Sequence, residues 1–161
     1  MLIFSLASAL AAEPTVTTQA DGTVVARMEV AASAEAIRAI LSDSEASVRL
    51  SADVLSVDAA LKGKCSEMTV QTKGAWNPLE YKALRCPTAN GWRTSLIESD
   101  DFSALEVEWK LDPSCSDLTT VEYRVRTDVD IVAPKALVQQ GVRRSARDTL
   151  KELLRKVLGG K

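Results

Sequence analysis

The chain has 161 residues, of which 46% are hydrophobic and 26% are charged, and its formal net charge is −2. These values are typical of one ordinary globular domain and give no basic footprint for nucleic acid. The chain has no histidine, the commonest general base and the commonest zinc ligand. We therefore expect no metal site, no cofactor and no nucleic-acid partner.

The first eleven residues are predicted to be a secretory signal peptide. Met1–Ala12 carries no charge, and its apolar stretch ends in Ala9-Leu10-Ala11, a small-x-small cleavage pattern. A positive n-region is lacking, and the stretch is too short to span a bilayer. The alternative is a buried N-terminal strand or a frayed start. The signal peptide predicts a periplasmic or secreted protein, and residues 12–22 are expected to form a flexible lead-in.

The first regular elements are one strand and two short helices. Residues 23–31 alternate apolar and polar side chains, as a half-buried strand does. Ser33 can cap a helix by accepting the amide hydrogens of Glu35 and Ala36. A second short helix is predicted over residues 44–50, entered from Asp43.

From Asp53 onward the pattern changes to period two and predicts six successive strands. Short turn-forming segments separate them, so consecutive strands must be antiparallel neighbours. The predicted strands are 54–62, 65–73, 79–86, 92–98, 104–111 and 118–129. Together with the first strand they make a seven-stranded sheet in one domain, residues 23–158.

Three cysteines suit an exported protein with one disulfide and one spare thiol. Antiparallel pairing around the turn at residues 74–78 sets Cys65 opposite Cys86, which a cross-strand disulfide can join. Cys115, in a turn, is then the odd one. A Cys86–Cys115 bridge is the rival pairing, because both would lie at the same end of the sheet.

Strand alternation also predicts which side chains face the interior. Tyr81, Trp109 and Tyr123 point inward, with Trp109 expected opposite Val121. Aromatic rings there could orient a ligand or simply fill the core.

Arg85 shares the inner face of the sheet, beside Ser66, and a buried charge needs a partner. An ion pair with a carboxylate is the first interpretation, and contact with a ligand headgroup is the second. Arg49 is a weaker candidate for the cavity mouth. The carboxylates considered for the ion pair are Glu98, Glu106 and Glu108, although a role in solvating the outer sheet surface is preferred for the last two.

The chain ends in a long amphipathic helix, predicted from Pro134 to Leu158, with apolar residues at three-to-four spacing. Its first half is lined by small or slender side chains, and its second half is rich in leucine. We expect the first half to roof a cavity and the second to seal the core, although close packing on the sheet is an equal alternative. The residues predicted to face a ligand are Val138, Gly141, Val142 and Ser145. The helix's basic face is expected to be solvated, and transient contact with a membrane is the alternative.

The order of strand, two small helices, six antiparallel strands and long helix resembles the helix-grip fold of the START-like (SRPBCC) superfamily. Within it, the coenzyme Q-binding/polyketide cyclase-like group is the nearest in pattern. The resemblance is carried by residues 25–37, Gly91-Trp92-Arg93 and the closing helix. It implies an α+β fold with a cavity for a lipid, sterol, quinone or polyketide between sheet and helix.

Three functions are compatible with these expectations. The first is non-catalytic binding or transport of a hydrophobic small molecule. The second is a cyclase- or hydrolase-type enzyme that uses Tyr123, Arg85 or an inner-face acid as proton donor. The third is a ligand-free interaction domain with a filled core. Because no nucleophile elbow, phosphate loop or metal-ligand cluster is found in the sequence, binding is preferred and no catalytic residue is assigned.

Overall fold

The computed structural model describes residues 13–159, so the predicted signal peptide, residues 1–11, lies outside the described residues. The strands are β1 (Thr15–Thr18), β2 (Val24–Val30), β3 (Val54–Lys62), β4 (Cys65–Thr72), β5 (Leu79–Thr88), β6 (Gly91–Glu98), β7 (Phe102–Cys115) and β8 (Leu118–Val129). The helices are α1 (Ala34–Leu41), α2 (Ser44–Val48) and α3 (Lys135–Val157).

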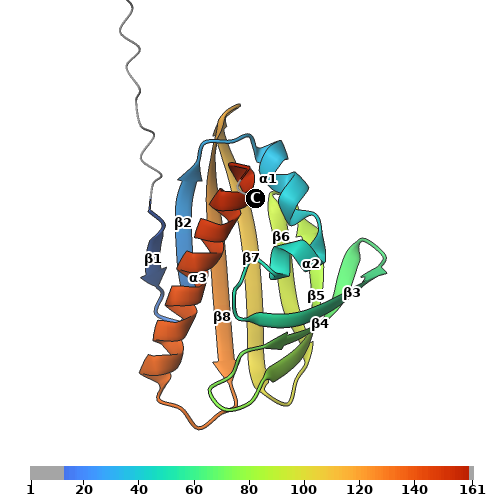
Figure 1. Cartoon of the computed structure of the whole chain (residues 1–161), viewed down its shortest axis with the longest axis vertical. Coiled ribbons are helices and arrows are strands. Elements are labelled where there is room, and N and C mark those ends of the chain that lie inside the picture. Colours follow the sequence, from blue (N-terminus) through green and yellow to red (C-terminus); the bar gives the residue numbers. More distant parts are fainter. Residues whose placement is uncertain (1–12, 160–161) are drawn as a thin grey trace, which may run out of the picture.

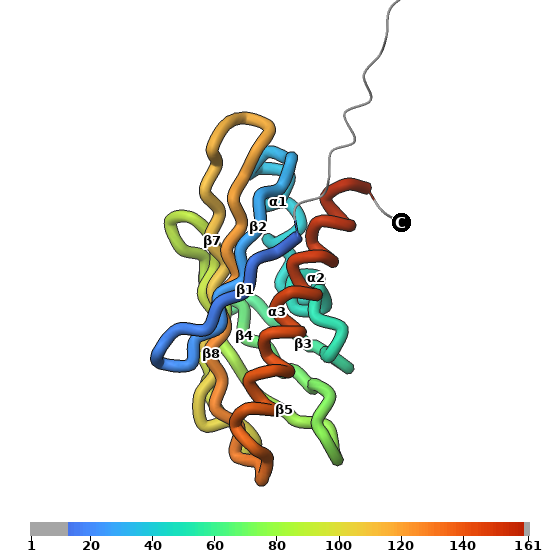
Figure 2. The backbone as a smooth tube through the Cα atoms, turned by 90° about the vertical axis from the view of Figure 1, so that its left-hand side faces the viewer, coloured from blue at the N-terminus to red at the C-terminus, as the bar shows by residue number. Residues whose placement is uncertain are grey.

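The strands form one antiparallel sheet in the order β1-β2-β8-β7-β6-β5-β4-β3. The sheet curves around α3, which lies against its concave side, while α1 and α2 close the neighbouring end (Figure 1). Figure 2 shows the same arrangement from the side, with α3 on one face of the strands. The α+β helix-grip architecture expected from the sequence is confirmed.

The sheet has eight strands among the described residues, whereas seven were predicted. The additional strand, β1, lies in the segment expected to be a flexible lead-in. Its Thr and Val side chains favour extended backbone, and it pairs with the edge of β2 from Thr15 opposite Arg27 to Thr18 opposite Val24. Arg143 of α3 donates hydrogen bonds to Thr18 Oγ1 at 2.7 Å and to the Val16 carbonyl at 3.1 Å.

Local sequence explains both short helices. Ser33 accepts the amide hydrogen of Ala36 at 3.2 Å, as predicted, but no such bond to Glu35 is present. Asp43 caps α2 by accepting the amide hydrogen of Ala46 at 3.0 Å. These caps satisfy backbone amides at the starts of α1 and α2 and so favour helix at these positions.

The β7–β8 hairpin differs from the prediction by two residues in register. β7 continues past Pro113 as far as Cys115, so the turn is shorter than expected. Trp109 therefore lies opposite Tyr123 rather than Val121, which pairs with Leu111. A shift of two residues keeps every side chain on its predicted face, so the inward-facing set is unchanged.

The hairpin of β4 and β5 matches its predicted register, with Ser66 opposite Arg85 and Val70 opposite Tyr81. Cys65 and Cys86 form the predicted disulfide, with their Cα atoms 4.3 Å apart. Cys115 is an exposed free thiol, which excludes the rival pairing.

Two apolar clusters flank the centre of the molecule. One joins β2, α1, β7 and β8 to the second half of α3, where Leu150 and Leu153 are completely buried. The other joins β3, β4, β5 and β7 around Val70 and Phe102. Gly91 allows β6 and β7 to approach closely, because a Cβ there would overlap the carbonyl oxygen of Trp109.

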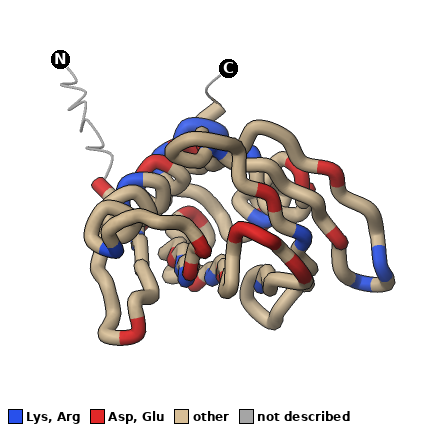
Figure 3. The backbone as a smooth tube through the Cα atoms, turned by 90° about the horizontal axis from the view of Figure 1, so that it is seen from below, with Lys and Arg blue, Asp and Glu red and all other residues tan. Residues whose placement is uncertain are grey.

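Charged residues of both signs are interspersed around the molecule rather than gathered by sign (Figure 3). Glu106 and Glu108 lie on the outer face of β7, as expected. Their carboxylates pair with Arg93 at 3.6 Å and with Lys110 at 3.3 Å. Such exposed pairs contribute little to stability.

Candidate functional site

A cavity of about 490 Å³ lies between the concave face of the sheet and α3. Side chains from both apolar clusters form its walls, so it separates the two halves of the core. Its apolar lining includes Val48, Met68, Leu79, Phe102, Leu105, Val107, Val125 and Val129. The cavity lies where the curved sheet stands away from the first half of α3.

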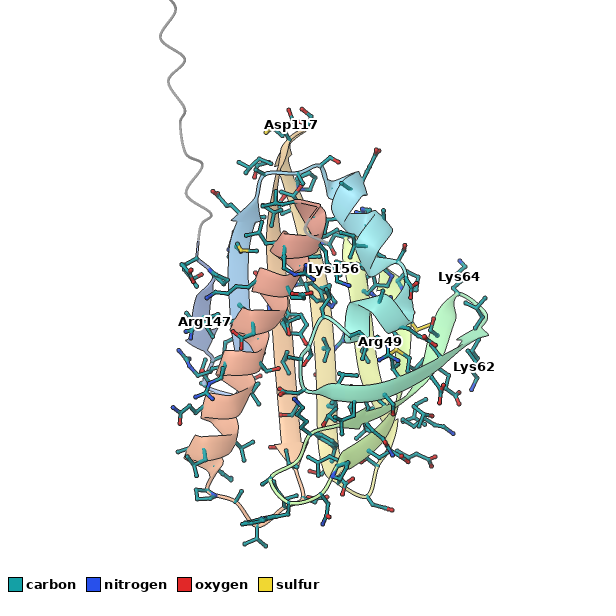
Figure 4. The ribbon with its side chains drawn as sticks, viewed as in Figure 1. Arg49, Lys62, Lys64, Asp117, Arg147 and Lys156 are labelled. Atoms are coloured by element: carbon teal, nitrogen blue, oxygen red, sulfur yellow. A yellow bond between two sulfur atoms is a disulfide. The ribbon has the colours of Figure 1, made fainter. Side chains whose placement is uncertain are left out.

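All eight residues predicted to face a ligand line this cavity. They are Arg85, Tyr81, Trp109, Tyr123, Val138, Gly141, Val142 and Ser145. Four come from strands and four from α3, which the sheet curvature brings to one space. Arg49, the weaker candidate, is an exposed residue at the end of α2 and is not part of the lining (Figure 4).

The small-residue half of α3 borders the cavity as expected. A Cβ added at Gly141 would meet no atom within 4 Å, so the glycine leaves open space instead of allowing close helix–sheet packing. Ala146, one turn later, lines the cavity and also joins the core, and Leu150 and Leu153 then close it. The first half of α3 therefore lines the cavity, and its second half packs in the core.

Two pairs of aromatic rings form much of the cavity wall. Tyr81 and Phe102 meet edge to face, with ring centroids 5.4 Å apart. Trp109 and Tyr123 are tilted by 46°, with centroids 4.4 Å apart. Burial raises the pKa of Tyr81 to about 12 and that of Tyr123 further still. Both phenols therefore stay protonated at neutral pH and can act only as neutral hydrogen-bonding groups.

Arg85 is the one buried cation of the lining, with 3% of its surface exposed. Its guanidinium donates to the carbonyl of Leu41 at the end of α1 and to Ser47 Oγ at 3.2 Å, with a longer contact of 3.4 Å to Ser44 Oγ. It also stacks over the Trp92 ring at 4.9 Å. Desolvation lowers the pKa of Arg85 to about 10, which leaves the side chain charged at neutral pH.

The predicted ion pair of Arg85 with Glu98, Glu106 or Glu108 is wrong. Among the described residues no carboxylate lies within 4 Å of its guanidinium. Arg85 points to the inner face, whereas these glutamates pair with lysine or arginine on the outer face. The end of α1 supplies a carbonyl instead, and the negative end of a helix dipole favours a cation there.

A group of hydroxyls continues from Arg85 towards α3. Ser47 contacts Arg85, and Ser51, one turn later in the chain, lies 3.3 Å from Ser145 of α3. Thr149, one turn after Ser145, is 2% exposed, and its hydroxyl has no hydrogen-bond partner among the described residues. Ser47, Ser51, Ser145 and Thr149 all line the cavity, so its inner end is polar although its walls are apolar.

Sequence reasoning missed Thr149, Ser47 of α2 and Ser51, which follows α2. Thr149 continues the spacing that identified Gly141 and Ser145, so extending the same helical stripe by one turn would have found it. Ser47 and Ser51 lie in a short helix and the turn after it, where no periodic pattern indicates a face. Their place over the cavity depends on how α2 packs on β3.

Residues of the β4–β5 turn and of the segment between β8 and α3 line the cavity, and both segments lie at the lower end of the molecule in Figure 1, so we take this end as the mouth. Gly74 and Ala75 border it from one side, and Ile131 and Leu137 border it from the other. Next to these residues Trp76 is 91% exposed and Val132 is fully exposed. Exposed apolar side chains from both turns, which we call the apolar rim, therefore lie beside the mouth.

The described residues hold no cluster of three or more potential metal ligands, and none of the described helices has the length and apolarity needed to cross a membrane. The acidic side chain in the cavity lining is Asp53. The arrangement can hold an apolar molecule, present a cation and neutral hydroxyls to one end of it, and exclude water from the rest.

A curved antiparallel sheet that encloses a cavity against one long C-terminal helix defines the helix-grip class. Within that class the chain has the START-like (SRPBCC) fold, as the solved structures that resemble it show. No protein-family model matches the chain, and no curated protein matches it in sequence.

Three solved structures illustrate the likeness. A START superfamily protein from Mycobacterium smegmatis is 22% identical, with a TM-score of 0.74 over 84% of this chain and 97% of its own. The Zhui aromatase/cyclase from Streptomyces sp. R1128 is 13% identical, and the match has a TM-score of 0.66 and covers 85% of this chain and 91% of the cyclase. A STAR-related lipid transfer protein from Xanthomonas axonopodis is 15% identical, and the match has a TM-score of 0.64 and covers 91% of this chain and 99% of the transfer protein. At these identities the likeness establishes the fold alone.

Proposed function

We propose that the protein binds a hydrophobic small molecule in the cavity and releases it unchanged. The observation that carries the proposal is the cavity of about 490 Å³ with apolar walls and one polar end. Sites of roughly 300–1,000 Å³ with this mixture hold small organic ligands. The names of the structural neighbours, a lipid transfer protein and an aromatase/cyclase, favour a lipid or a polyketide, and the sequence resemblance adds a quinone or a sterol as candidate ligands.

Native mass spectrometry of the protein purified from its own host tests this function. We expect a bound apolar molecule that is absent after denaturation, and uptake of a neutral apolar dye by the emptied protein. Gly141→Leu should weaken dye binding at least ten-fold, because the new side chain enters open space in the cavity. Gly141→Ala is the matched control and should bind nearly as well as the wild type.

Two outcomes would contradict the proposal. A protein that carries no ligand and takes up no dye would favour the ligand-free interaction domain. Recovery of the captured molecule with a changed mass would favour the cyclase or hydrolase alternative, in which Tyr123 or Arg85 would supply a proton. The raised pKa of Tyr123 makes its phenol a poor proton donor at neutral pH, which supports binding without chemistry.

We also propose that the protein acts outside the reducing cytosol, in the periplasm or as a secreted protein. The Cys65–Cys86 disulfide supports this location, because such bridges persist in oxidising compartments. The uncharged, apolar start of the chain supports it from the sequence. N-terminal sequencing of the mature protein should begin near residue 12, and an intact Met1 would contradict export.

Transient membrane contact is the proposed route by which the ligand enters and leaves. Trp76 and Val132 form an apolar rim beside the mouth, where a bilayer could deliver a molecule directly into the cavity. The basic side chains of α3 are a weaker candidate for this contact. Arg143 binds β1, and Lys151 pairs with Glu13 at 3.1 Å.

A further inference from the structure

The polar end of the cavity carries a charge that the described part of the chain does not neutralise. Arg85 is buried, and its direct partners are one carbonyl and two hydroxyls, all neutral. The negative charge of Asp43 raises the pKa of Arg85, but the two side chains do not form an ion pair. A buried cation without a counter-ion is costly, which leaves a place for an anion from outside the chain.

The guanidinium also has donors to spare. Arginine carries five N–H groups, and the described contacts of Arg85 use three of them. The remaining two have no partner among the described residues, and Arg85 borders the cavity. Nη2 already uses both of its N–H groups, so the free ones lie on Nε and Nη1, and each can donate one charge-assisted hydrogen bond to an anionic oxygen such as that of a carboxylate.

Thr149 provides a second, independent observation at the same end. Thr149 lines the cavity, and its buried hydroxyl has no partner among the described residues. The contacts Arg85–Ser47 and Ser51–Ser145 connect the guanidinium to the turn of α3 that precedes Thr149. An unpartnered hydroxyl and a cation without a direct anionic partner therefore belong to two residues that line the same cavity.

We infer that the ligand is an acid: an apolar chain or ring system that ends in a carboxylate, which Arg85 and Thr149 hold at the inner end of the cavity. This inference rests on the proposed binding function and adds the chemistry of the ligand's polar end. The apolar part of the ligand then lies along the aromatic pairs towards the mouth, beside Gly141. Arg85 keeps its structural contact with Leu41 while it binds the ligand.

Two probes of equal chain length test the inference at pH 8, dodecanoate below its micelle concentration and 1-dodecanol below its solubility limit. Both are titrated against protein that holds a neutral fluorescent dye, and displacement gives their affinities. We expect dodecanoate to bind the wild type at least ten-fold more tightly than 1-dodecanol. Equal affinity of the two probes would overturn the inference and leave the proposed function standing. Failure of the protein to bind the dye or either probe would overturn the proposed function itself.

Single variants test whether Arg85 and Thr149 cause the preference for dodecanoate over 1-dodecanol. Thr149→Val keeps the side-chain shape and removes only the unpartnered hydroxyl, so it should fold normally and lower the preference for the acid about three-fold or more. Arg85→Gln should abolish the preference. Since this variant also loses contacts to α1 and α2, Thr149→Val keeps the test valid if Arg85→Gln does not fold. Thr127→Val, in the same lining near the mouth, is the matched control and should leave the preference unchanged. An unchanged preference in Thr149→Val would remove Thr149 from the proposed site.

Discussion

Trp109 and Tyr123 lie directly opposite each other on β7 and β8, with their ring centroids 4.4 Å apart, and both line the cavity. Trp109 is buried and belongs to the core, so the rings connect the packing of the sheet to the wall of the binding site. Aromatic pairs of this kind contribute roughly 0.5–1.5 kcal/mol beyond their buried area. A ligand would therefore rest on a surface that also stabilises the fold.

The tyrosines give a pH prediction. The chain has two, Tyr81 and Tyr123, and burial raises both pKa values above the usual value of 10.0, for Tyr81 to about 12. Folding thus favours the neutral phenols. Their contribution to stability is complete below pH 10 and is lost as the pH rises from about 10 through the folded-state pKa. Absorbance at 295 nm should stay flat to pH 11 in the native protein and rise near pH 10 in urea.

The single variants Tyr81→Phe and Tyr123→Phe serve as controls, because each should remove half of the absorbance change in urea. A native protein that ionises one tyrosine near pH 10, with its circular dichroism unchanged, would show that this phenol is exposed to solvent.

Removal of the disulfide should cost about 3 kcal/mol of unfolding free energy, because the bridge closes a loop between residues 21 apart in sequence. The double variant Cys65→Ser, Cys86→Ser should show this loss in urea denaturation. Cys115→Ser should leave stability unchanged, since that thiol is exposed and unbridged. A thiol titration of the native wild type should count one reactive group, and three would contradict the bridge.

Gly141→Ala should raise the free energy of unfolding by about 1 kcal/mol, because glycine is unfavourable within a helix and the new Cβ meets no atom within 4 Å. Thermal denaturation measures the change. Gly91→Ala provides the contrast and should destabilise, since its Cβ overlaps the backbone of β7. A destabilised Gly141→Ala would mean that the space above α3 is filled.

The exposed rim predicts binding to neutral membranes. Trp76→Ser should reduce co-sedimentation with phosphatidylcholine vesicles roughly ten-fold, because the variant loses an apolar side chain large enough to insert. Leu61→Ser is the control, since Leu61 is 87% exposed but lies on the β3–β4 hairpin, away from the mouth. Lys62 and Lys64 mark that hairpin in Figure 4. If both variants bind the vesicles equally well, the apolar rim is not the membrane contact. If added salt abolishes vesicle binding, basic side chains make the contact instead.

Much of the fold could be predicted from the sequence, because most strands alternate apolar and polar residues and consecutive strands pair across short turns. Alternation fixed β3 and β8 at their observed ends, and the turn after β4 fixed the register that joins Cys65 to Cys86. The β7–β8 register was harder, since Pro113 suggested an early turn but the strand continues past it. β1 was missed because its single apolar residue, Val16, gives almost no alternation.

The candidate site could be predicted in part. Residues on one helix stripe or one strand face, such as Gly141 and Tyr123, can be predicted from the helical or strand periodicity of the sequence alone. The partner of Arg85 could not be predicted, because the contact with Leu41 joins residues 44 apart through the packing of α1 on the sheet. Long-range polar contacts of this kind leave no pattern in a single sequence.

The pairing of β2 with β8 has a consequence for the order of folding. β2, the second strand of the described chain, joins β8, which ends at Val129, with Met28 opposite Val121. Until β8 has been made, the buried side chains of β2 have no neighbour strand on that side. Contacts so distant in sequence slow folding, typically to milliseconds or longer. An exported chain would gain from this delay, since its leading segment stays unfolded, and able to cross a membrane, until its end arrives.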